Sequence, residues 1–489
     1  MSPGQPKRAF IKGALWTIGG RWLVRVMGVL NTLVLARILM PSDYGVVAMA
    51  MLLVGLIQAV SDMGVATALL RNKDADEQDI NSAWTLRCLQ GLAMAAITIA
   101  AAPVAAWFFN EPRVQGVLLI LAACMALDGL GSLGWVLAQL RFDFSLDFRL
   151  QLISKASGVL AAWGTAVVIA DYRALVAGIV ATYVVRFFLG YALHPYRPKW
   201  TTSRISEIWR VTKWLMLSST ALFLLRRSDE LIAAKIAPTA SFGAYHVGSD
   251  IGRAPVGEIG PPLMKAFLPV LASFREDRER VNAVVLKTIA ATSTVTMPVA
   301  IGMWSLSTLF VEVVMGSKWL EAAPFLAVYA LVSLVQFAAN PLSTLLILHG
   351  HTQTQSKAAW IELSVFLIAT LLLLPGMQLM GLVWARFLAS AVNLMSMMAF
   401  ARKMTGLQTL LVLKAYWRPA LGSLIMALVL ALFDPFAKAA PWLHLLASVA
   451  LGMSVYAVWA LASWRISGKP EGFESTVFDF LSRRRLRSK

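Results

Sequence analysis

The first apolar segment of the chain carries two arginines. Arg21 and Arg25 lie four residues apart in the run from Gly13 to Gly45, so a helix would present both on one face. If the helix begins near Ala14, Arg25 lies about 16 Å along it, close to the middle of a roughly 30 Å hydrocarbon layer. An arginine facing lipid there costs about 2.5–3.5 kcal/mol on insertion scales. The spacing therefore predicts a basic helix face that lines a water-filled cavity.

A second basic pair lies in the apolar segment 213–236. Arg226 and Arg227 are followed there by Asp229 and Glu230. Because Glu230 stands three and four residues beyond the two arginines, ion pairs along the helix could neutralise them. The alternative, which we favour because charge is rare inside membranes, is that at least one arginine faces the cavity.

The segment 242–271 carries a polar stripe. His246, Asp250 and Arg253 recur at i, i+4 and i+7, so they share one helix face. The stripe is either a salt-bridged seam inside the protein or part of the cavity wall. Lys155 and Arg186 lie nearer to predicted segment ends, where long basic side chains snorkel to the membrane surface.

These intramembrane charges divide into two candidate sets. The basic set would bind the substrate: Arg21, Arg25, Arg87, Arg226, Arg227 and Arg253. The second set would carry a coupled ion: Asp62, Asp128, His246 and Asp250. Six mid-membrane charges facing lipid would cost about 15–20 kcal/mol, more than typical net stability. Most must therefore face protein or water, and the excess of cations implies an anionic ligand.

The elements that position these residues are predicted to be membrane-spanning helices. The 489 residues are 58% hydrophobic and 14% charged, whereas about a quarter of a soluble protein is charged. Apolar segments of roughly 20 residues recur about fourteen times, which predicts an all-α polytopic membrane protein with about fourteen transmembrane helices. The net charge of +18 then belongs to loops that face anionic lipid and does not indicate nucleic-acid binding.

Basic residues alternate between successive connections. They concentrate at both termini and near 71–73, 197–210, 275–280 and 402–414, whereas the intervening connections have few. The positive-inside rule therefore places both termini in the cytoplasm. Because Arg21 and Arg25 interrupt the first apolar run, we interpret it as an uncleaved first span and not as a signal peptide.

An internal repeat divides the chain. Ala-Arg-Ile at 36–38 followed by Tyr-Gly at 44–45 matches Ala-Lys-Ile at 234–236 followed by Phe-Gly at 242–243, at an offset of 198. This offset spans an even number of helices, so it predicts two parallel, pseudo-symmetric six-helix lobes, and transporters of this kind bind substrate between their halves. The predicted divisions are an N-terminal lobe, a C-terminal lobe, and two extra helices with a basic tail: 1–200, 201–405 and 406–489.

Motifs for chemistry on a substrate are missing. The sequence has no GxxxxGK[ST] nucleotide-binding loop. His349 and His351 are two residues apart, which is not metal-ligand spacing on a helix, and Cys88 and Cys124 have no partner at motif spacing. We therefore expect a transporter with no cofactor and no metal, and not an enzyme.

Three short motifs carry a resemblance to a known family. VLARILMPSDYG at 34–45, the turn at 62–65 and Ala-Leu-Leu-Arg at 68–71 resemble the polysaccharide transporters of the multidrug/oligosaccharidyl-lipid/polysaccharide exporter superfamily. The resemblance implies a flippase of the bacterial inner membrane for O-antigen, capsule or exopolysaccharide biosynthesis. Its substrate would be an undecaprenyl-pyrophosphate-linked oligosaccharide, moved from the cytoplasmic to the periplasmic leaflet by alternating access. A polysaccharide polymerase and chain-length machinery would be its partners.

Four alternatives stay open. A lipid II flippase would use the same anion-binding logic, whereas a cation-coupled multidrug exporter would favour acidic cavity walls. A membrane glycosyltransferase or polymerase would require a large loop outside the membrane that carries acid and base residues, and the outer connections here are short. A structural scaffold for polysaccharide assembly would tolerate neutralisation of the intramembrane arginines.

Overall fold

A computed structural model describes residues 5–61, 76–140, 143–274, 277–433, 436 and 438–468. Across these residues the chain is helical and contains no strand, which confirms the predicted all-α class. Asp62 lies outside the described residues, and so does the side chain of Arg21, although its backbone belongs to the first helix.

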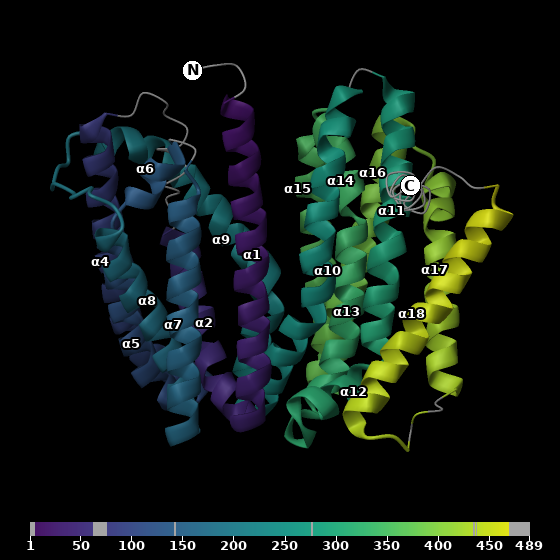
Figure 1. Cartoon of the computed structure of the whole chain (residues 1–489), viewed down its shortest axis with the longest axis horizontal. Coiled ribbons are helices and arrows are strands. Elements are labelled where there is room, and N and C mark those ends of the chain that lie inside the picture. Colours follow the sequence, from purple (N-terminus) through teal and green to yellow (C-terminus); the bar gives the residue numbers. More distant parts are fainter. Residues whose placement is uncertain are drawn as a thin grey trace, which may run out of the picture. The chain divides into compact units, whose positions relative to one another are not determined.

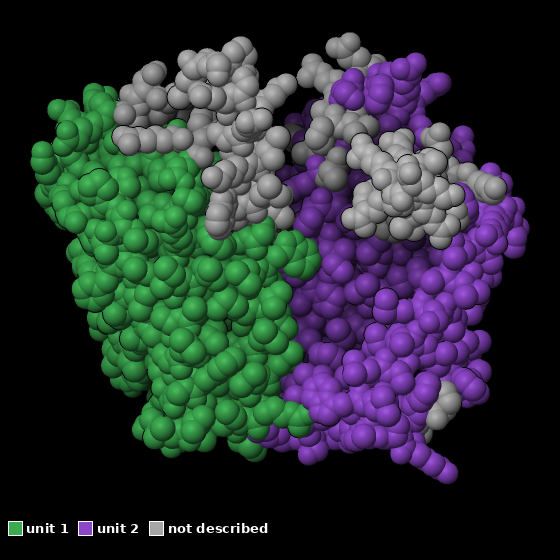
Figure 2. Space-filling model, in the orientation of Figure 1, with its two compact units in different colours: residues 1–243 green, residues 244–489 purple. Residues whose placement is uncertain are grey.

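The helices form two compact units, residues 1–243 and 244–489 (Figures 1 and 2). The first unit contains α1 (Gln5–Ile38), α2 (Pro41–Ser61), α4 (Glu77–Phe109), α5 (Arg113–Gly129), α6 (Gly134–Leu140), α7 (Ser145–Ile169), α8 (Arg173–Ala192), α9 (Ile205–Ile236) and the start of α10 (Thr239–Ser273). The second contains the rest of α10, α11 (Arg278–Ser305), α12 (Ser307–Phe310), α13 (Ala322–Ala338), α14 (Asn340–Leu348), α15 (Thr352–Met377), α16 (Leu379–Thr405), α17 (Thr409–Leu432) and α18 (Pro441–Ile466). The repeat-based boundaries near 200 and 405 stay a prediction.

Most of these helices are long and apolar enough to cross a membrane. Within the described residues ten pass this test, counting α13 and α14 together, and up to eleven pass if α5 and α6, bent by 46°, form one span. Helices α1, α9 and α10 also have spanning length, with 34, 32 and 35 residues, but each carries several charged residues. The chain is therefore a multi-pass membrane protein, and the total of fourteen spans stays a prediction.

The connection from α8 to α9 is fixed along the first turns of α4. The Tyr196 hydroxyl donates to Asn81 Oδ1 at 2.8 Å, and the Lys199 backbone N–H donates to the same oxygen at 3.2 Å. Arg204, which precedes α9, lies 3.6 Å from Asp76 and 3.8 Å from Asp79. These contacts set where α9, with its charged residues, begins relative to α4.

The internal repeat has a direct structural counterpart in the first unit. Gly45, one turn into α2, lies so close to the Thr239 carbonyl that a Cβ atom would stand 2.1 Å from its oxygen. Gly243, one turn into α10, lies in the same way against the Pro41 carbonyl, at 1.8 Å. Both pairs are separated by the repeat offset, since 239 − 41 and 243 − 45 each equal 198. The contact is thus reciprocal, and it requires glycine at both repeat positions.

We predict that Gly243→Ala destabilises the protein by about 1–3 kcal/mol, because the two helix starts must separate to admit the methyl group. Gly164→Ala in α7 is the matched control, since no atom lies within 4 Å of its Cβ position and alanine is the better helix former there. Thermal unfolding in detergent measures both. Equal melting temperatures for Gly243→Ala and the wild type would contradict the claim that the contact between the two helix starts requires glycine.

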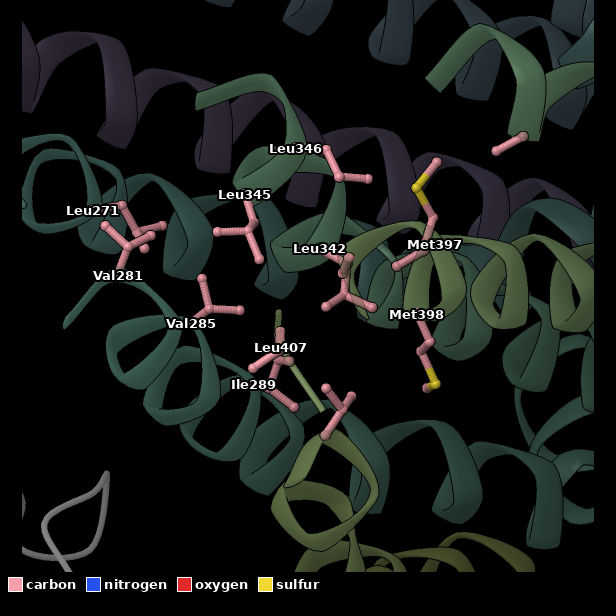
Figure 3. Packing of buried hydrophobic residues seen from close by; sticks show 14 residues of the cluster. Leu271, Val281, Val285, Ile289, Leu342, Leu345, Leu346, Met397, Met398 and Leu407 are labelled. Carbon is pink, nitrogen blue, oxygen red and sulfur yellow. The ribbon is translucent and has the colours of Figure 1, made fainter. Parts of the chain in front are cut away.

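A buried apolar cluster holds one end of the second unit together. It joins the end of α10 and the start of α11 to α14, α16 and the start of α17, as Figure 3 shows for Val281, Leu345, Met397 and their neighbours. Leu407, in the turn between α16 and α17, is 2% exposed. The turn is therefore anchored in the core, and the two helices that it connects have fixed directions.

Candidate functional site

Arg25 of α1 lies beside a second cation, Lys155 of α7. The two helices pack in parallel: the ring of Phe148 lies against Gly20, and Lys155 Cε would stand 3.9 Å from a Cβ at Gly28. Lys155 is half-buried, and Arg25 is the charged group that acts on it electrostatically. Among the described residues Lys155 has no hydrogen bond and no carboxylate within ion-pair distance.

Two adjacent like charges inside a membrane protein repel one another, and the low dielectric strengthens that repulsion. Two neighbouring cations also attract an anion. Both side chains suit phosphate, since the guanidinium binds two oxygens at once and the ammonium acts as a point charge. The Arg25–Lys155 pair is therefore the best candidate for an anion-binding site in the first unit.

Lys155 is the residue that sequence reasoning missed. The apolar pattern predicts a segment over 149–170, which places Lys155 near its start and predicts snorkelling. The helix in fact begins at Ser145, which puts Lys155 about 15 Å along it. At that position the Lys155 side chain lies against Gly28 of α1.

Arg87 of α4 and Asp128 of α5 form an ion pair. Arg87 Nη2 lies 3.1 Å from Asp128 Oδ2, with the two side chains 17% and 35% exposed. With Tyr183 and Arg186 they line a cavity of about 20 Å³, which is room for about one water molecule. Arg87, a candidate for the substrate, and Asp128, a candidate for an ion, are thus brought together, and each would have to leave the other to perform the predicted role.

The charges of α9 are partly neutralised within the helix. Arg227 Nη1 donates to Glu230 Oε1, the i,i+3 pair expected from the spacing. Asp229 and Glu230 are fully buried. Arg226 is exposed, and within the described part of the chain it makes no ion pair. Arg226 is therefore the α9 residue that is available to a ligand.

The polar stripe of α10 borders the face that packs on α13. Gly248 and Gly252 form that packing face, because Cβ atoms there would stand 2.6 and 2.5 Å from carbonyl oxygens of α13; small residues four apart permit such close packing in membranes. Arg253 stacks on the Tyr329 ring with its Cζ 4.2 Å from the centroid. Asp250 is exposed and His246 is half-buried, so Asp250 is the most accessible residue of the stripe.

The candidate residues thus gather in separate places. Unit 1 holds the Arg25–Lys155 pair, the Arg87–Asp128 pair and Arg226, whereas the α10 stripe belongs to unit 2. In the described ranges no group of three histidine, cysteine, aspartate or glutamate side chains could hold a metal ion.

Comparison with known families decides the relationship. The family described as "Polysaccharide biosynthesis protein" matches residues 34–324, more than half of the chain. The chain belongs to this family. The match begins at Val34, where the VLARILMPSDYG motif begins, so the resemblance predicted from that motif is confirmed.

Curated relatives of this polysaccharide biosynthesis protein match over most of their length. The lipopolysaccharide biosynthesis protein WzxC of Escherichia coli is 22% identical, covering 91% of this chain and 87% of the relative. The succinoglycan biosynthesis transport protein ExoT of Rhizobium meliloti is 24% identical, covering 88% of each. The teichuronic acid biosynthesis protein TuaB of Bacillus subtilis is 22% identical, covering 79% and 81%.

Solved structures show the fold. The lipid II flippase MurJ in an inward closed conformation matches with a TM-score of 0.74 at 15% identity, covering 92% of this chain and 99% of that one. An inward-facing multidrug resistance MATE transporter of the MOP superfamily matches with a TM-score of 0.52 at 15% identity, covering 81% and 94%. The polysaccharide biosynthesis protein therefore has the fold of these transporters.

Proposed function

We propose that this protein flips an undecaprenyl-pyrophosphate-linked oligosaccharide from the cytoplasmic to the periplasmic leaflet of a bacterial inner membrane, with both termini in the cytoplasm. The observation that carries the proposal is the Arg25–Lys155 pair, two neighbouring, half-buried cations where α1 packs on α7. The names of relatives in lipopolysaccharide, succinoglycan and teichuronic acid biosynthesis support the class of substrate.

The basic side chains would hold the pyrophosphate while the sugar passes through water. Moving the charged head group bare through hydrocarbon would cost tens of kcal/mol. Arg25 and Lys155 supply the first contact, and the spacing of four residues in the sequence predicts that Arg21 joins them. Arg226 is a further cation of unit 1 for the substrate, and Arg87 joins it when its pair with Asp128 opens; Arg253 would be the cation of unit 2. The polyprenyl tail stays in lipid.

The membrane potential would drive the transfer of the anionic head group between the leaflets. With the cell interior negative, each negative charge that moves outward gains roughly 2.3 kcal/mol per 100 mV. Coupling to an ion would use Asp62, Asp128, His246 or Asp250. Of the described members of this set, exposed Asp250 is the acidic residue best placed to exchange an ion with water, because Asp128 is held by Arg87.

Proteoliposomes test the proposal directly. Purified protein is reconstituted with a fluorescent polyprenyl-pyrophosphate oligosaccharide, and a membrane-impermeant quencher reports the leaflet. We expect faster exchange between leaflets than in empty vesicles, and a further increase when a valinomycin potassium gradient supplies the potential. Exchange at the rate of empty vesicles would refute the flippase function, whereas exchange without dependence on the potential would refute only the driving force.

Lipid II in the same vesicles tests the rival substrate. The fold similarity to the lipid II flippase makes this the alternative to exclude first. Faster exchange of lipid II than of the oligosaccharide lipid would reassign the protein to peptidoglycan precursors. We expect the reverse order, because the family match is to polysaccharide biosynthesis.

A further inference from the structure

A pocket opens where α16 ends and α17 begins, in unit 2. It has a volume of about 430 Å³ and is lined by Met395, Met398, Ala399, Arg402, Lys403 and Thr409. None of these residues belongs to the candidate substrate or ion sets. The volume falls in the range of small-molecule binding sites, about 300–1,000 Å³.

The pocket exists because the two helices diverge after a fixed turn. Gly406 takes the left-handed conformation, with φ of 76°, and its N–H donates to the Arg402 carbonyl at 3.2 Å. The Asn282 side chain donates to the Thr405 carbonyl at 3.1 Å, which ties the turn to α11. From there α17 packs mainly along α11 and α18, so it leaves the side of α16 open.

The lining has two chemical zones at different depths. Arg402 and Lys403 are in the last turn of α16 and are exposed. Met398 and Met395 precede Arg402 by four and seven residues, so they lie about 6 Å and 10 Å further along α16, toward its centre. Met395 is 58% exposed. Cationic groups at a helix end, followed inward by flexible apolar side chains, match a charged head group with a hydrocarbon tail.

We propose that this pocket binds one anionic phospholipid of the cytoplasmic leaflet. Its phosphate contacts Arg402 and Lys403, and the first part of an acyl chain lies against Met395 and Met398. The alternative explanation, that the two cations only complement the negative end of the α16 dipole, accounts for neither the pocket nor its methionine wall. A phospholipid accounts for both, and its inner-leaflet position follows from the basic connections at this end of the unit.

Native mass spectrometry of the delipidated full-length protein tests this site. The probes are dioleoyl phosphatidylglycerol and dioleoyl phosphatidylcholine, which share acyl chains and differ in charge. We expect the first phosphatidylglycerol to bind more tightly than phosphatidylcholine, and Arg402→Gln with Lys403→Gln to weaken it by about 10- to 30-fold. Lys357→Gln with Arg465→Gln is the matched control, because it removes two exposed cations of the same unit that do not line the pocket.

Two further measurements separate a lipid from a free phosphate. Met395→Gln should weaken phosphatidylglycerol binding as well, and an excess of glycerol phosphate should not displace the lipid. The proposal is overturned if the pocket variant binds phosphatidylglycerol like the wild type, if the control loses as much affinity, or if glycerol phosphate competes. Because the assay contains no oligosaccharide lipid, its result is independent of the proposed flippase function.

Discussion

Changing Arg25 to glutamine is expected to reduce polysaccharide export by about 10- to 100-fold, because a charge-assisted hydrogen bond to phosphate contributes about 1.5–3 kcal/mol. Glutamine keeps much of the length and the polarity of arginine. The loss of export therefore measures the contribution of the guanidinium charge and of its two-pronged hydrogen bonding. Export is measured as polymer at the cell surface in a deletion strain, with the variant at the same membrane abundance as the wild type.

Arg173→Gln provides the control for Arg25. Arg173 begins α8, is largely exposed and lies 3.7 Å from Asp171, and exposed pairs of this kind contribute little stability. Its replacement removes the same charge from the same unit without touching the Arg25–Lys155 pair. Export by Arg25→Gln at the wild-type level would remove Arg25 from the proposed site. An equal loss in both variants would attribute the effect to overall charge.

Changing Lys155 to methionine is expected to separate function from stability. Export should fall about tenfold or more, because the phosphate loses one of two adjacent cations. Thermal stability should stay the same or rise, because the variant removes a like-charge repulsion from Arg25 and places an apolar chain of similar length against Gly28. Both are measured on one preparation, by flipping in proteoliposomes and by thermal unfolding.

Two further variants distinguish an anion-binding role of Lys155 from a packing role. Lys155→Arg keeps the charge and should retain most of the export. Arg149→Gln changes an exposed cation of the same helix and should affect neither property. If Lys155→Met instead lowers the melting temperature and exports normally once abundance is matched, then Lys155 serves packing and the anion site is elsewhere.

The glycine contact suggests why the repeat was visible in the sequence at all. Gly45 and Gly243 lie against the carbonyls of Thr239 and Pro41 at distances that exclude a Cβ atom. A requirement this strict fixes residue type at equivalent positions of both halves, whereas apolar positions elsewhere accept many side chains of similar volume. The short matching motifs therefore mark the reciprocal contact, and they say little about the rest of each lobe.

The sequence by itself determined the class of protein and which charges share a helix face. Segment lengths and the low charge content require membrane-spanning helices, and spacing along a helix fixes which side chains share a face, as with Arg227 and Glu230. The offset of 198 residues located the internal symmetry, and the motif at 34–45 located the family.

Only the tertiary structure decided which helix stands beside which charge. Arg87 and Asp128 are 41 residues apart, and nothing in the local pattern indicates that they pair. The sequence predicts that Lys155 lies near a segment end. In the structure α7 begins at Ser145, and Lys155 lies against α1. The physical reason is that periodicity gives the rotation and rise of a side chain on its own helix, whereas the neutralisation of an intramembrane charge depends on lateral packing between helices distant in sequence.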